Sequence, residues 1–247
     1  MKIKNTFFWL MIATPILGVL GALLRWWLYA TGMDIHGLLI AGHPAQLLTW
    51  VMTLAAAVLL VLGALQLKGK PEYQHNFPPS ALGAIGYLLA AAAAIVRLVP
   101  RLHGPYDTLN LAVTVLCGLS AIALAILAWL RYTGKKPSPL LFFIICAWLM
   151  VDLVMLYRLW SATPQIQNYC FSLLANVCVM LSVYYTATFA ADMGNRQMHT
   201  LFHLLAAFFC LISLPKCDDP LYYALICGFM MLETCPPTDE KNEEQLS

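Results

Sequence analysis

Arginines that continue stripes of small residues are the first candidates for a binding site. The stripes follow the i, i+3, i+7 spacing of one helix face and consist of Gly18, Gly21 and Arg25, and of Gly83, Gly86, Ala90 and Arg97. Small residues let helices approach closely in a bilayer, so both stripes should face neighbouring helices. Together with Arg158, these guanidinium groups could grip a carboxylate or phosphate through paired N–H donors. The alternative is that each arginine extends to the lipid headgroups.

Asp152 is the acidic residue that lies deepest in an apolar segment, in the stretch VDLVMLYRLWS. A charge at mid-helix costs roughly 2.5–3.5 kcal/mol on insertion scales, and such a residue normally faces the bundle interior and a partner. Arg158 follows six residues later, which places it about 120° around the helix from Asp152. Asp152 therefore needs a partner on another helix, and Asn176 lies at a similar depth in the next segment. A structural interhelical hydrogen bond is the alternative to a functional role.

Two histidines at an i, i+4 spacing suggest a different chemistry. His199 and His203, in the stretch MHTLFHLL, lie on one face of a helix, where two imidazoles can share a metal ion. This HxxxH pattern resembles that of the hemolysin-III and adiponectin-receptor family of membrane zinc proteins. The resemblance covers these two positions and implies a membrane-embedded zinc-dependent hydrolase. The family's further histidine and aspartate have no clear counterpart, although His75 and Asp192 fall on the same predicted side of the membrane.

The composition requires that membrane-spanning helices position these residues. Of 247 residues, 61% are hydrophobic and 11% are charged, whereas a soluble domain has about 25% charged residues. The apolar residues form separate runs of about 16 to 24, close to the roughly 20 that one helix needs to cross a bilayer. The runs do not alternate as barrel strands would, and helices satisfy their own backbone in lipid. The net charge of +2 is too small to indicate a nucleic-acid partner.

The apolar runs predict an all-α polytopic bundle of seven or eight transmembrane helices. The expected spans are 7–30, 44–67, 81–98, 108–131, 139–160, 168–191, 200–214 and 220–234. All prolines except Pro15 fall at or between these boundaries, as expected because proline breaks a helix in its interior. The last two spans are short and joined by the turn KCDDP, so seven spans with a re-entrant final segment are the alternative. Residues 1–235 then form one helical domain, followed by an acidic disordered tail, 236–247.

The distribution of basic residues predicts a cytoplasmic N-terminus. With eight spans in that orientation, nine lysines and arginines fall on the inner side and five on the outer side. Basic residues accumulate on the cytoplasmic side of bacterial and eukaryotic membrane proteins, so this orientation is favoured over its reverse. Arg25, Arg97 and Arg158 then share the outer side.

Three blocks of the chain resemble uncharacterised multi-pass membrane proteins of Gram-positive gut bacteria. The blocks are GALLRWWLYATGMD, GHPAQLLTW and YRLWSATPQIQNYCF. The resemblance extends over most of the chain and implies a helical bundle in a bacterial plasma membrane. It implies no particular activity.

Together these residues predict a protein that binds or transports a small polar or anionic solute, or a lipid headgroup, in an outward-facing cavity. The expected ligand-binding residues are Arg25, Arg97, Arg158, Asp152 and Asn176. One alternative is the zinc-dependent hydrolase that would use His199 and His203. Another is a non-catalytic partner subunit whose small-residue stripes dock a second membrane protein. We expect membrane lipid as a partner, no cofactor, and binding rather than catalysis.

Overall fold

A computed structural model describes residues 2–34, 38–40, 42–67, 69, 71–103, 107–160 and 169–233. The expected tail 236–247 lies outside the described residues. Within these described residues, seven helices are long and apolar enough to cross a bilayer: α1 (Lys2–Thr31), α2 (Pro44–Ala64), α4 (Ala81–Leu102), α5 (Thr108–Thr133), α6 (Pro139–Trp160), α7 (Cys170–Ala190) and α8 (Arg196–Ser213). Shorter elements are α3 (Tyr73–Asn76), the 3-10 helix η2 (Leu214–Lys216) and α9 (Pro220–Leu232). The predicted all-α polytopic bundle is confirmed.

Local sequence explains where several helices begin and end. The Ser80 hydroxyl accepts a hydrogen bond from the Gly83 amide at the start of α4, and Asn195 caps α8 in the same way. Gly134 ends α5 in a left-handed conformation, with φ of 71°, which glycine adopts without strain. Because Asn195 supplies this cap, α8 begins at 196 rather than at the expected 200. Helix α4 continues to 102 through Pro100, which its last turn accommodates.

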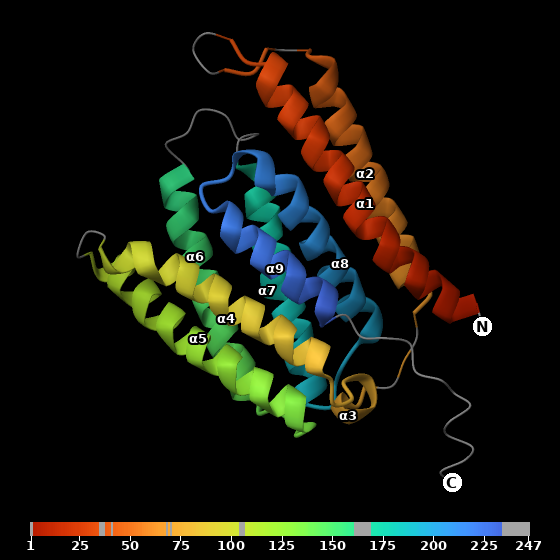
Figure 1. Ribbon diagram of the computed structural model, residues 1–247, viewed down its shortest axis with the longest axis vertical. Helices are drawn as coiled ribbons and strands as arrows, with labels where there is room; N and C mark the ends of the chain where they lie inside the picture. Colours follow the sequence, from red (N-terminus) through yellow and green to blue (C-terminus); the bar gives the residue numbers. More distant parts are fainter. Residues whose placement is uncertain are drawn as a thin grey trace.

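Six helices form a closed ring, and two more lie outside it (Figure 1). Each of α4, α5, α6, α7 and α8 packs against the next, and α9 lies between α8 and α4 and completes the ring. Helix α1 packs on the outer flank of α8, and α2 packs on α1 and α8. The ring has two ends, and the buried side chains inside it come from helices distant in sequence.

The small-residue stripes face neighbouring helices, as expected. A methyl group added at Gly18 would lie 2.6 Å from the Leu211 side chain of α8, and one at Gly86 would lie 3.2 Å from Leu232 of α9. The α4 stripe is buried as far as Arg97, and Arg25 is buried as well. Both arginines therefore lie inside the protein rather than extending from its surface.

Candidate ligand-binding site

A buried cluster of ionic side chains links α4 to α6. The Nη1 group of Arg97 and the Nη2 group of Arg101 donate to the two carboxylate oxygens of Asp152. The side chains of Arg97 and Asp152 are each 2% exposed, and that of Arg101 is 14% exposed. The sequence correctly required a partner for Asp152 on another helix. The partners are these two arginines instead of Asn176.

Three further residues fix the plane of the Arg97 guanidinium. Its central carbon lies 3.5 Å from the centre of the Tyr222 ring, so the group stacks on that ring. The Asn176 Oδ1 atom lies 3.4 Å from Arg97 Nη1 and accepts a hydrogen bond of 3.3 Å from the Tyr222 hydroxyl. The Asn176 amide nitrogen donates to the Tyr223 hydroxyl at 2.9 Å. Asn176 therefore positions the two tyrosines and, through them, Arg97.

A cavity opens beside Arg97, at the end of the ring where α9 begins. At one end of the ring, Glu233, which follows α9, lies close to Gly83, near the start of α4. At the other end, Asp219, which lies just before α9, forms an ion pair with Arg97. Five further residues of α4 extend beyond Arg97 to Leu102, a distance of about 8 Å.

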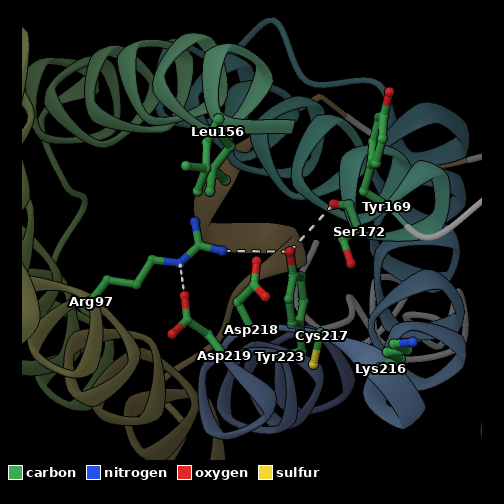
Figure 2. A pocket seen from close by; sticks show the side chains of 10 residues that line it. Arg97, Leu156, Tyr169, Ser172, Lys216, Cys217, Asp218, Asp219 and Tyr223 are labelled. Atoms are coloured by element: carbon green, nitrogen blue, oxygen red, sulfur yellow. Dashed lines mark hydrogen bonds and ion pairs between the residues drawn. The ribbon is translucent and has the colours of Figure 1, made fainter. Parts of the chain in front are cut away.

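The cavity has a volume of about 340 Å³ and a mixed polar lining (Figure 2). It lies at the end of the bundle that carries Arg97 and the turn between η2 and α9, hereafter the Arg97 end. Its lining consists of Arg97, Leu156, Leu159, Tyr169, Ser172, Lys216, Cys217, Asp218, Asp219 and Tyr223. A volume of this size is at the lower limit for small-molecule sites, which suits a ligand of a few heavy atoms.

One edge of the Arg97 guanidinium faces this cavity. Figure 2 shows the Nε atom directed at Asp219 and a terminal nitrogen directed at the Tyr223 hydroxyl. Both contacts are long: Nε lies 3.6 Å from the Asp219 carboxylate, and Nη2 lies 3.5 Å from the hydroxyl. The buried Nε has no hydrogen-bond partner. Nη1 is bound to Asp152, so the Nε–Nη2 edge is the part of Arg97 that can bind a ligand.

The other two arginines of the predicted site lie elsewhere. Arg25 donates from Nη1 to the Ile212 carbonyl at 2.9 Å and from Nη2 to the Tyr29 hydroxyl at 2.7 Å, so it joins α1 to α8. Arg158 is exposed on α6. Neither lines the cavity, although Leu156 and Leu159 on either side of Arg158 do. The structure thus brings Arg97, Asp152 and Asn176 together and leaves Arg25 and Arg158 apart.

Sequence reasoning missed several residues of the site. Arg101 follows Arg97 by four positions and so shares its helix face, which was a usable signal. Asp219 and the pair Tyr222 and Tyr223 lie in or directly after the turn KCDDP, which was treated only as a connection. Their role depends on α9 packing against α4, and no local pattern reveals that contact.

The opposite end of the ring, hereafter the Arg131 end, is closed by a second ion pair. Arg131 Nε lies 3.2 Å from a carboxylate oxygen of Glu233, and both side chains are buried. Arg131 also donates to the Pro78 carbonyl and lies over the Phe77 ring at 5.3 Å. Burial raises the pKa of Glu233 to about 7, against the opposing effect of Arg131. Ion pairs therefore hold both ends of α9.

The two histidines of the predicted metal site lie near this closed end. Their rings are fully buried and 3.9 Å apart between centres. The Nδ1 atom of His203 lies 2.8 Å from the Ser182 hydroxyl and 3.0 Å from the His199 carbonyl. Among the described residues, no group of three or more histidine, cysteine, aspartate or glutamate side chains could hold a metal ion. The pair would thus supply at most two protein ligands from this part of the chain.

Comparisons of the chain with protein-family models, curated proteins and solved structures found no match. The chemistry of the site must therefore be argued from its own geometry.

Proposed function

We propose that this integral membrane protein binds a small polar or anionic solute, or a lipid headgroup, in the cavity at the Arg97 end. The observation that carries the proposal is the Nε–Nη2 edge of Arg97, which is held in place and directed into the cavity. An arginine edge of this kind matches a carboxylate or phosphate group through two parallel N–H donors. Tyr222, Asp152 and Asn176 already fix the guanidinium, so binding would order it little further.

The two ends of the bundle support a role in transport. The cavity opens at the Arg97 end, whereas Arg131, Glu233 and Phe77 fill the Arg131 end. A binding site reached from one side, with an ion pair closing the other, is the arrangement expected of one state of an alternating-access transporter. Because the residues directly before and after α9 take part in the two ion pairs, a movement of α9 would change both ends of the bundle together.

We further propose that the Arg97 end faces the outside of a bacterial cell. The excess of basic residues near the Arg131 end, among them Arg131, Lys135, Lys136 and Arg196, supports a cytoplasmic position for that end. The resemblance to multi-pass proteins of Gram-positive bacteria supports the plasma membrane as its location.

The test uses Cys217, a half-buried thiol in the cavity lining. A membrane-impermeant maleimide applied to intact cells should label it, and Cys217→Ser should remove that signal. Burial raises the pKa of this thiol to about 11, with smaller effects from Arg25 and Asp219. Because the thiolate is the reactive form, labelling should proceed about tenfold faster for each pH unit up to pH 9.

Binding is then measured as protection of Cys217 in the purified protein. The probes are acetate, inorganic phosphate, methylammonium, glycine and sn-glycero-3-phosphoethanolamine in detergent, and vesicles with or without phosphatidylethanolamine. Arg97→Lys keeps a cation for Asp152 but removes the paired donors, so it should abolish protection. Arg25→Lys changes an equally buried arginine outside the cavity and should leave protection intact. Labelling that requires permeabilised cells would overturn the outward-facing cavity, and no protection by any probe would overturn ligand binding.

A further inference from the structure

We infer that the ligand is a zwitterion, whose oxyanion binds the Nε–Nη2 edge of Arg97 and whose ammonium group binds Asp219. This inference rests on the proposed function and assigns a class of ligand to the same cavity. The arginines alone suggested a site for a simple anion, whereas the ligand that we infer also carries a cationic group.

The charged side chains that line the cavity balance one another before a ligand enters. The lining has two cations, Arg97 and Lys216, and two anions, Asp218 and Asp219. Arg97 is also paired with Asp152, which Arg101 contacts as well. A charge that lacks a counter-charge is expensive at membrane depth. A zwitterion leaves the balance unchanged, whereas a simple anion or a simple cation adds one uncompensated charge.

Asp219 links the binding of the ligand oxyanion to the binding of the ligand ammonium group. Its carboxylate lies 3.6 Å from Arg97 Nε, beyond hydrogen-bond length, and its side chain is 37% exposed. A ligand oxyanion at about 2.8 Å from Nε would form the shorter, stronger contact and displace Asp219. The displaced carboxylate of Asp219 then lacks a cation beside it. The ammonium group of the same ligand supplies that cation.

The orientation of Lys216 agrees with this assignment. Its ammonium nitrogen lies 4.9 Å from the centre of the Tyr29 ring and 3.6 Å from the Met33 sulfur, on α1 and just after it. Lys216 is therefore directed toward α1, and Figure 2 shows it pointing away from Arg97. The carboxylates of Asp218 and Asp219 lie closer to the Arg97 edge in the same view.

The remaining lining limits the size of the ligand and leaves two sources for it. Leu156 and Leu159 provide an apolar wall, and the cavity volume is about 340 Å³. A free amino acid-like solute fits this space, and so does an ethanolamine phosphate headgroup whose acyl chains stay outside. Both carry an ammonium group and an oxyanion on one small skeleton, which is the shared chemistry that we assign.

The experiment compares matched probes in the Cys217 protection assay. Glycine should protect at concentrations where acetate and methylammonium do not, and sn-glycero-3-phosphoethanolamine, the phosphodiester headgroup without its acyl chains, should protect where inorganic phosphate does not. At ten times the dissociation constant, the labelling rate should fall about tenfold. Protection by the free zwitterions identifies a solute, whereas protection only in vesicles that contain phosphatidylethanolamine, relative to phosphatidylglycerol alone, identifies a headgroup. Either result supports the inference.

Two aspartate variants provide the control. Asp219→Asn should remove the advantage of the zwitterions over their anionic counterparts. Asp107→Asn, which changes an exposed aspartate before α5 at the same end of the bundle, should retain it. If acetate and phosphate protect as well as glycine and sn-glycero-3-phosphoethanolamine, or Asp219→Asn keeps the preference, the zwitterion is refuted and the binding function stands. If no probe protects, the binding function itself is refuted.

Discussion

Replacing Asp152 by asparagine should destabilise the bundle more than any other conservative change near the cavity. The substitution keeps the side-chain volume and removes the carboxylate that Arg97 and Arg101 share. The buried Arg97 then keeps only its longer contact with Asp219 among the described residues, and the partly buried Arg101 loses its contact with Asp152. Breaking a buried ion pair from one side costs about 3–5 kcal/mol, and asparagine can still accept one hydrogen bond, so we expect about 3 kcal/mol. That is a large part of the 5–15 kcal/mol that typically separates folded from unfolded protein.

Asp219→Asn provides the matched comparison. Asp219 also faces Arg97, but at 3.6 Å and with a side chain 37% exposed, so its loss should cost no more than about 1 kcal/mol. The free energy of unfolding can be measured by titrating the purified protein with SDS in mixed micelles and following tryptophan fluorescence. Trp148, which is buried one turn before Asp152 on α6, makes this signal sensitive to the affected region.

A double variant separates the ion pair from unrelated effects on α6. Arg97→Gln combined with Asp152→Asn removes one cation with the anion, so it should cost less than the sum of the two single changes. The coupling should exceed about 1.5 kcal/mol, because contacting residues in one ionic network are not additive. Costs that add to within about 0.5 kcal/mol, or a loss below 1 kcal/mol for Asp152→Asn alone, would refute the reasoning.

Two further predictions concern the Arg131 end. Gly83→Ala should lower the free energy of unfolding by about 1–3 kcal/mol, because the added methyl group would lie 2.7 Å from Arg131 Nε and 2.8 Å from Glu233. The control is Gly118→Ala on α5, whose methyl group would meet nothing within 4 Å. In the same SDS titration this control should be neutral or stabilising. The pKa of Glu233, raised by burial to about 7 from its ordinary 4.5, means that the folded state holds this proton more tightly than the unfolded state. The stability of the folded state should therefore fall as the pH rises from about 4.5 to about 7 and level off above. The melting temperature of Glu233→Gln should not show this dependence on pH. An unchanged pH dependence in that variant would contradict the assignment to Glu233.

The sequence predicted the helices well because their signals are local. Apolar length, prolines and caps lie within each segment, and the spacing of Gly83, Gly86 and Arg97 sufficed to place that face against a neighbour. The angle between Asp152 and Arg158 along one helix likewise sufficed to exclude their pairing as stacked neighbours.

The composition of the site was harder to predict because it depends on contacts between distant segments. Arg25 belongs to a helix outside the ring, and nothing in its own segment says so. Asp219 lies beside Arg97 because α9 begins there and packs against α4. We expected three arginines to converge, and one of these three lines the cavity. It is held by residues that the packing of α4, α6, α7 and α9 brings together.

The position of Arg97 along α4 also has an electrical consequence. Arg97 lies about 8 Å below the end of α4, roughly a quarter of a hydrocarbon core about 30 Å thick. An ion that reaches Arg97 through the cavity would cross a similar fraction of the membrane potential, worth about 0.6 kcal/mol per charge at 100 mV. The affinity for a monovalent ion would thus change about threefold with that voltage. A zwitterion carries no net charge through the field, so the binding that we propose would not depend on the membrane potential.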